Sequence, residues 1–279
     1  MEHGVLDSAR TPSEVVVGRI VAIANQKGGV GKTTTSVNLA AALAIAERHV
    51  LLIDADPQAN TTRALGLPED PERASLYDAF SGSASLEEIR LPLDEVKGLD
   101  LIPSDRHLIG AELELTEAMA REFRLKRLLE PIRDQYQHIL IDCPPSLGLL
   151  TLNALTAADA VLIPVQCEFL ALEGISQLMD TLERVRQALN PALEVGGVVM
   201  TMFDERTNLS RQVVDEVRNV FGERVYDTVV PRNIRLGEAP SHGKPIFLYD
   251  IRSRGADAYL NLAKEFVKHE EKGIGQGTQ

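Results

Sequence analysis

The 279-residue chain contains no tryptophan, only 4% aromatic residues, and two cysteines, Cys143 and Cys167. With so few rings, its core must be aliphatic, which suits a parallel sheet covered by helices. The cysteines lack the spacing of metal ligands, so we interpret them as small buried residues of a reduced, cytoplasmic protein. No apolar run is long enough to predict a membrane span or a signal peptide.

Positive charge is also scarce, since 29 Lys and Arg residues face 41 Asp and Glu residues and the net charge is −12. This balance argues against a general nucleic-acid coat but allows a local basic patch. Residues 231–255 form such a patch, with five Lys or Arg residues against two carboxylates. Arg206, in the segment FDERTNLSRQ, is a candidate to join it. We predict a phosphate-contact surface there.

Apolar runs alternate with helical patterns along most of the chain. The expected strands are 19–25, 49–56, 98–104, 139–145, 160–166 and 194–203. This alternation predicts one α/β domain with a mostly parallel twisted sheet flanked by helices, in which the second strand lies beside the first. We assign residues 1–18 to a flexible tail, 19–270 to the domain and 271–279 to a polar tail. The last helix is expected at about 256–269.

The stretch KGGVGKT follows the first strand and precedes a good helix, which is typical of a phosphate loop. Its glycines let backbone N–H groups approach a polyphosphate, and the helix N-terminus adds positive potential. Lys32 supplies charge to the β- and γ-phosphates, and the Thr33 hydroxyl is suited to Mg²⁺. The sequence therefore predicts ATP and Mg²⁺ as cofactors. The predicted contacts within the loop are Gly28, Gly29, Val30, Gly31, Lys32, Thr33 and Thr34.

Three aspartates follow apolar runs at the edge where open α/β sheets bind ligands. Asp54 and Asp56 lie two residues apart, so they point the same way if the strand continues through both. Two carboxylates beside a triphosphate indicate Mg²⁺ organisation and activation of water. Asp142 ends another strand, in ILIDCPP.

Five segments together resemble the ParA/MinD superfamily of ATPases with a deviant Walker A motif, and most of all the small chromosomal ParA proteins of the Soj type. They are NQKGGVGKTTT, DADPQAN, DCPPSLG, PVQCEFLALEG and PRNIRLGEAPSHGKPI. The resemblance implies that Lys27 is the signature lysine, which reaches the phosphates bound by the other subunit of a dimer. It further implies that Asp56 positions the attacking water, that Asp54 supports the loop or the metal, and that Asp142 lies near Mg²⁺.

By the same resemblance, Pro231 and Asn233 lie near the adenine, while arginines matching Arg206 and Arg235 bind duplex DNA without sequence preference. Arg232 and Lys244 belong to the same basic segment. The implied function is chromosome or plasmid segregation by a cytoplasmic, nucleoid-associated ATPase. ATP drives homodimerisation and DNA binding, and a ParB-type partner stimulates hydrolysis.

Two other functions stay open at this point. One is a MinD-like, membrane-associated regulator, although the C-terminal helix lacks the basic polar face that anionic lipids favour. The other is a scaffold that binds nucleotide without hydrolysing it.

Overall fold

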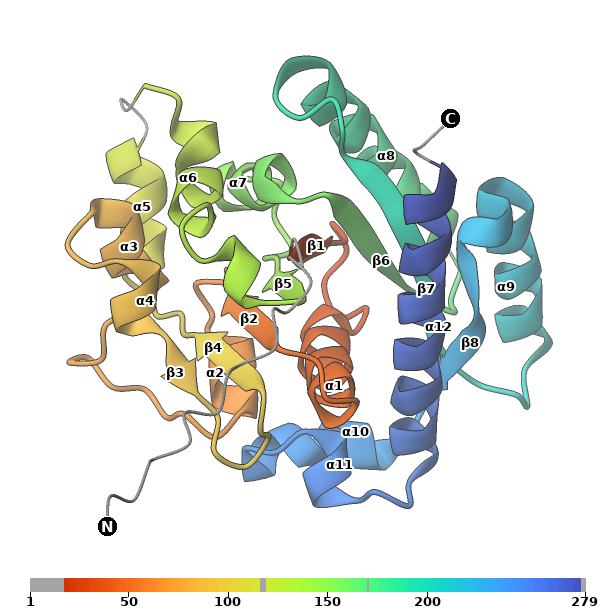
Figure 1. Cartoon of the computed structure of the whole chain (residues 1–279). Coiled ribbons are helices and arrows are strands. Elements are labelled where there is room, and N and C mark those ends of the chain that lie inside the picture. The colour runs from red at the N-terminus through yellow and green to blue at the C-terminus, as the bar shows by residue number, and fades with distance from the viewer. Residues whose placement is uncertain (1–17, 116–118, 170, 277–279) are drawn as a thin grey trace, which may run out of the picture.

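A computed structural model describes residues 18–115, 119–169 and 171–276. The predicted N-terminal tail lies outside these residues except for Gly18. The strands are β1 (Arg19–Ile23), β2 (Val50–Asp54), β3 (Leu91–Pro92), β4 (Leu99–Ile102), β5 (His138–Asp142), β6 (Ala160–Gln166), β7 (Glu194–Phe203) and β8 (Val225–Pro231). They form one eight-stranded sheet in the order β3-β4-β2-β5-β1-β6-β7-β8, visible at the centre of Figure 1. Only the β3–β4 pair is antiparallel.

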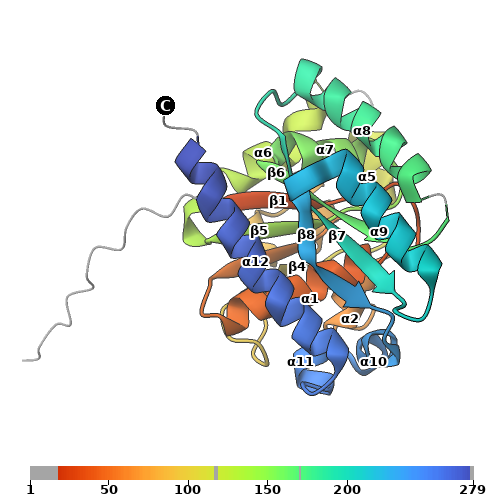
Figure 2. The same cartoon turned by 90° about the vertical axis from the view of Figure 1, so that its right-hand side faces the viewer.

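Helices cover both faces of the sheet (Figures 1 and 2). One face carries α3 (Leu76–Ser81), α4 (Leu86–Ile89), α5 (Leu108–Glu114), α6 (Arg124–Leu129), α7 (Leu149–Ala157), α8 (Ala171–Ala188) and α9 (Asn208–Phe221). The other carries α1 (Lys32–Ile45), α2 (Asn60–Ala64), α10 (Ile234–Glu238), α11 (Ile246–Tyr249) and α12 (Arg254–Gln276). Short 3₁₀ turns occupy Arg121–Phe123, Arg133–Gln135, Gly222–Arg224 and Ala239–His242.

The alternation of side chains along each strand builds two hydrophobic clusters. In β1, Ile20 and Ala22 belong to the cluster on the first face, and Val21 and Ile23 to the cluster on the second. All four are at most 2% exposed. A central strand of a parallel sheet is buried on both sides, which explains why the expected strands appear as continuous apolar runs. The predicted fold class is confirmed.

One expectation about strand order is wrong. The strand that carries Asp54 does not lie beside β1, because β5 lies between β1 and β2. The crossover through α1 skips one strand position, and β5 fills it later. In the resulting register Asp142 pairs with both Ile23 and Asp54. The observed strand order therefore places Asp54 and Asp142 side by side at the carboxyl ends of their strands.

The last helix continues to Gln276, beyond the expected end near residue 269. Tyr259, Leu262 and Phe266 are buried in the cluster that includes α1, so the helix packs on the domain as predicted. Glu270 links the later turns of α12 to the sheet, since one of its carboxylate oxygens lies 2.7 Å from Nε2 of His138 in β5. Both cysteines are buried, as predicted. None of the helices within the described residues is long and apolar enough to cross a bilayer.

Gly197 in β7 is a close-contact position that tests this packing. A Cβ atom there would lie 2.4 Å from a ring carbon of Tyr226, whose side chain is almost completely buried. We expect Gly197→Ala to lower the free energy of unfolding by about 1 to 3 kcal/mol, since the buried ring has no space to move. Gly237→Ala is the control, because nothing lies within 4 Å of its added methyl group. Thermal melting of both variants measures the difference, and equal stability would contradict the packing.

Candidate functional site

The loop between β1 and α1 lies at the carboxyl edge of the sheet. Gly29 (φ 75°) and Gly31 (φ 89°) adopt left-handed conformations that residues with a Cβ rarely adopt. A Cβ atom at Gly28 or Gly29 would meet nothing within 4 Å, so the outer side of the loop is open. The Thr201 hydroxyl donates to the Val30 carbonyl oxygen at 2.8 Å and holds the loop against β7. The loop is thus preformed, and the N-terminus of α1 suits an anion.

The two lysines of the loop have different surroundings. Lys32 is 8% exposed, and its amino group donates to the carbonyl oxygen of Lys27 at 3.2 Å. Burial lowers the pKa of Lys32, and the nearby Asp142 carboxylate opposes this shift. Lys27 stands at the rim, where its amino group forms an ion pair with Glu168 of the same chain. The amino group of Lys32 therefore lies inside the loop, whereas that of Lys27 lies at the loop entrance in an ion pair that solvent can reach.

Asp142 connects three parts of the site. Its Oδ2 accepts hydrogen bonds from the hydroxyls of Thr33 at 2.9 Å and Thr61 at 2.7 Å. Its Oδ1 accepts one from Ser36 at 2.9 Å. Burial raises the pKa of Asp142, and these three hydrogen bonds oppose the shift. The contacts tie the ends of β5, α1 and α2 together.

Asp54 holds the loop that follows it. Its Oδ2 accepts from the backbone N–H and the hydroxyl of Thr62, at 2.8 and 2.7 Å, and its Oδ1 accepts from the N–H of Asp56 at 3.2 Å. Burial, followed by the charge of Asp142, raises the pKa of Asp54 to about 7. Both carboxylate oxygens are engaged with protein donors. Of the two roles predicted for Asp54, these contacts favour support of the loop over direct metal binding.

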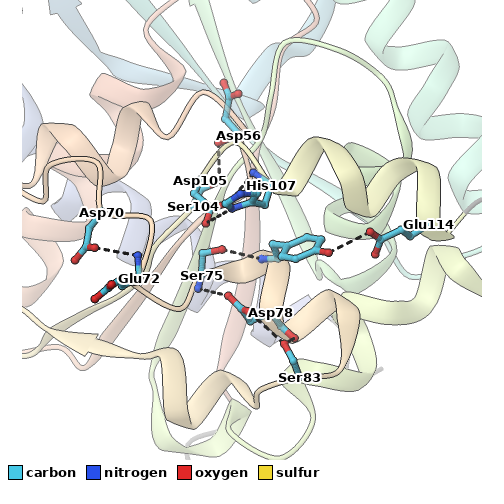
Figure 3. Close-up of polar contacts among 11 residues, drawn as sticks. Asp56, Asp70, Glu72, Ser75, Asp78, Ser83, Ser104, Asp105, His107 and Glu114 are labelled. Atoms are coloured by element: carbon cyan, nitrogen blue, oxygen red, sulfur yellow. Dashed lines mark hydrogen bonds and ion pairs between the residues drawn. The ribbon is translucent and has the colours of Figure 1, made fainter.

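Asp56 is the one of the three aspartates with a carboxylate oxygen left over. Its Oδ1 accepts from the N–H of Gln58 at 2.9 Å, and the other carboxylate oxygen accepts no hydrogen bond within the described part of the chain. The Ser104 hydroxyl donates to its backbone carbonyl at 2.8 Å, and Figure 3 shows the carboxylate pointing away from Ser104. Asp56 is thus fixed in the backbone while its side chain keeps an acceptor for water.

The donor set fits a magnesium ion that is shared with phosphate. Thr33 gives its hydroxyl proton to Asp142, so the lone pairs of its oxygen stay available. Hydroxyl and carboxylate oxygens are hard donors of the kind Mg²⁺ prefers, and Mg²⁺ usually keeps waters and phosphate oxygens as its other ligands. Among the described residues, no group of three or more His, Cys, Asp or Glu side chains could hold a metal alone.

Several residues of the site were not predicted from the sequence. Ser36, Thr61, Thr62 and Ser104 supply hydroxyls to the aspartates or their loop, and Glu168 holds Lys27. The available signal was the run of hydroxyl residues directly after each motif, in KTTTS and in NTT.

The predicted adenine contacts lie at the end of β8 and directly after it. Pro231 ends that strand, and Asn233 caps α10 by accepting a hydrogen bond from the N–H of Arg235 at 2.8 Å. The Asn233 carbonyl oxygen is therefore occupied within the chain, while its amide NH₂ remains a donor for a ligand. The adenine contact stays a prediction.

The predicted DNA-binding arginines gather at the carboxyl ends of β7 and β8. Arg206 lies in the loop before α9 with 85% of its side chain exposed, and Arg235 lies in α10 with 54% exposed. The N–H of Arg232 donates to the Phe203 carbonyl oxygen at 2.9 Å and joins the two loops. Lys244 instead lines a cavity of about 360 Å³ beside the start of α1, together with Thr34 and Ser241. The structure thus groups the arginines but places Lys244 nearer the phosphate loop.

Comparison with known proteins identifies relatives. The family described as an AAA domain matches residues 18–195. The chain is 56% identical to the sporulation initiation inhibitor protein Soj of Bacillus subtilis, covering 89% of this chain and 98% of that protein. It is 55% identical to the chromosome partitioning protein ParA of Caulobacter vibrioides, covering 90% and 95%. Cobyrinic acid a,c-diamide synthase from Mycobacterium smegmatis, solved with an ATP analogue and magnesium, superposes with a TM-score of 0.81 at 38% identity, covering 92% and 97%.

The hydroxyl of Thr62 tests the network around the aspartates. It donates to Asp54 and accepts from the N–H of Ser104 at 3.0 Å, and all three groups are buried. We expect Thr62→Val to lower the free energy of unfolding by about 1 to 3 kcal/mol, because both partners lose a hydrogen bond without gaining water. Thr181→Val is the control, since among the described residues the Thr181 hydroxyl bonds only to the carbonyl oxygen of Gln177 on the exposed side of α8. Chemical denaturation compares the two, and equal losses would show that the network adds no stability.

Proposed function

The chain belongs to the Soj/ParA family of chromosome-partitioning ATPases, and from that premise we propose that it uses ATP to assemble a dimer that binds DNA without sequence preference. The observation that carries the proposal is the open phosphate loop with Lys32 inside it and the linked Thr33–Asp142 pair beside it. The loop would hold the phosphates of ATP, and Thr33, whose hydroxyl is oriented by Asp142, would hold Mg²⁺.

Hydrolysis depends on Asp56. Its backbone is held by the Asp54 carboxylate and the Ser104 hydroxyl. Its carboxylate accepts from the N–H of Gln58 through Oδ1 and keeps a second acceptor, which orients a water toward the γ-phosphate. A ParB-type partner accelerates this step and thereby releases the DNA. Nucleoid association follows from the DNA-bound state. Phosphate release measured with and without duplex DNA and a cognate partner tests this proposal, and a chain that hydrolyses no ATP under any of these conditions is a nucleotide-binding scaffold instead.

Dimerisation depends on Lys27. In the single chain its amino group is paired with Glu168, and both side chains are more than a third exposed. An exposed ion pair contributes little net stability, so Lys27 can leave Glu168 for another anionic partner at little cost in free energy. In the dimer Lys27 leaves Glu168 and contacts the phosphates bound by the other subunit. ATP becomes part of the interface in this arrangement.

The two lysine variants separate binding from assembly. Lys32→Ala is expected to abolish tight nucleotide binding, because it removes the buried cation inside the loop. Lys27→Ala is expected to keep nucleotide binding in the monomer and to lose the ATP-dependent dimer. Nucleotide titration and size-exclusion chromatography with a slowly hydrolysed ATP analogue measure the two properties. A normal dimer from Lys27→Ala would remove the contact between subunits from the proposal.

Arg235→Glu tests the DNA surface. Each phosphate neutralised on duplex DNA contributes about −0.9 to the slope of log affinity against log salt. Charge reversal occurs twice per dimer, so affinity is expected to fall at least tenfold and the slope to become shallower. Arg218→Glu is the matched control, because Arg218 lies in the last turns of α9 and pairs with Asp227 near the amino end of β8, away from the carboxyl end that leads to Arg235. Salt titrations on unrelated duplexes, with dimerisation checked in parallel, give the answer. An unchanged slope would exclude Arg235.

A further inference from the structure

The exposed arginines beside β7 and β8 are held by carboxylates of their own chain. Arg206 pairs with Asp204, Arg235 with Glu238 and Asp250, and Arg254 with Glu205. We call this set the arginine–carboxylate rim. Its three arginines face four carboxylates, so the rim itself carries no excess positive charge. Arg232 and Arg252 lie in the same region and form no ion pair with any described residue.

The Arg206–Asp204 pair has the geometry that a phosphate would need. Nε of Arg206 donates to Oδ1 of Asp204 at 2.9 Å, and a terminal nitrogen donates to Oδ2 at 2.7 Å. The Arg206 guanidinium holds the pKa of Asp204 well below its usual range. A guanidinium binds a phosphate through the same parallel pair of N–H groups. A DNA phosphate and the Asp204 carboxylate therefore compete for one set of donors.

Resting on the proposed DNA-binding function, we propose that Asp204 is a built-in competitor of DNA at Arg206 and sets how tightly each protomer binds. The Arg206 side chain is 85% exposed and that of Asp204 is 20% exposed, so a DNA phosphate can reach the guanidinium and replace the carboxylate as its anionic partner. The released carboxylate then stays close to the DNA backbone and repels it. One protomer consequently gains little from contact with DNA, and two rims must act together in the dimer. Glu238 holds Arg235 through one hydrogen bond, from a terminal nitrogen to Oε2 at 2.8 Å, and so competes there for a single donor.

A different role for Asp204 predicts the opposite sign. If the carboxylate served to position Arg206 for DNA, its removal would weaken binding. The two roles are separable because an asparagine keeps the local turn. The N–H of Arg206 donates to Oδ1 of Asp204 at 3.1 Å, and an asparagine carbonyl oxygen can accept that bond. The backbone contacts of residue 204 with Ser210 and Thr207 do not involve its side chain.

The experiment compares Asp204→Asn with the wild type as dimers held by a slowly hydrolysed ATP analogue, titrated with an unrelated duplex at several salt concentrations. We expect Asp204→Asn to bind about three- to tenfold more tightly, with a salt slope at least as steep as that of the wild type. Asp227→Asn is the matched control. It makes the same change in charge at an exposed carboxylate that pairs with Arg218 near the amino end of β8, away from Arg206. Asp204→Glu keeps the charge and is expected to bind like the wild type.

A second background shows whether the gain passes through Arg206. In Arg206→Ala, the further change Asp204→Asn is expected to give clearly less gain than in the wild type. A loss of affinity in Asp204→Asn, no change, or an equal gain in Asp227→Asn would each overturn the proposal. Melting curves and the dimer fraction of each variant identify any loss that comes from unfolding. A wild-type dimer that binds no duplex even at low salt would refute the proposed function itself, which is a separate outcome.

Discussion

The buried carboxylate of Asp142 is the constraint on which the candidate site depends. At 1% exposure it needs donors from the protein, and three hydroxyls from α1 and α2 provide them. Because burial of an unpaired charge is costly, these contacts fix the start of α1 and the loop after β2 relative to β5. Asp54 lies beside Asp142 in register and is itself satisfied by Thr62 and by the backbone of Asp56. The position of Asp56 is thus a consequence of two buried neighbours.

Much of this arrangement could be predicted from the sequence. Continuous apolar runs marked the buried strands, and the glycine-rich stretch between a strand and a helix marked the phosphate loop. The strand order could not be predicted, because hydrophobicity says that a strand is buried but not which strand is its neighbour. The expectation that β2 lies beside β1 failed for this reason. The expectation that the last helix ends near residue 269 was wrong, because Glu270 makes a contact with His138, in a strand that is distant in the sequence.

The partners of the functional side chains were the least predictable part. Ser36, Thr61 and Thr62 are hydroxyl residues in helices, where sequence alone favours neither a buried partner nor solvent. Nothing in the sequence distinguishes Asp204 from the other carboxylates of a chain with net charge −12. Its contact with Arg206 spans two positions in a turn and depends on side-chain conformation. Motifs therefore indicated where cations lie, whereas only the structure showed which of them are already neutralised.

The same physical situation occurs at two of the proposed phosphate contacts, Lys27 at the entrance of the loop and Arg206 beyond β7. Lys27 is paired with Glu168 and Arg206 with Asp204, and in each pair solvent reaches at least one of the two groups. Such pairs are weak enough to exchange and strong enough to orient the cation. Lys32 differs, since its buried position keeps it inside the loop at all times. The fixed cation suits binding of the chain's own nucleotide, while the exchangeable ones suit contacts that form only on assembly. Replacing one carboxylate partner by a phosphate brings little free energy. The proposed binding to DNA therefore depends on several such replacements at once, which a dimer provides and a single chain does not.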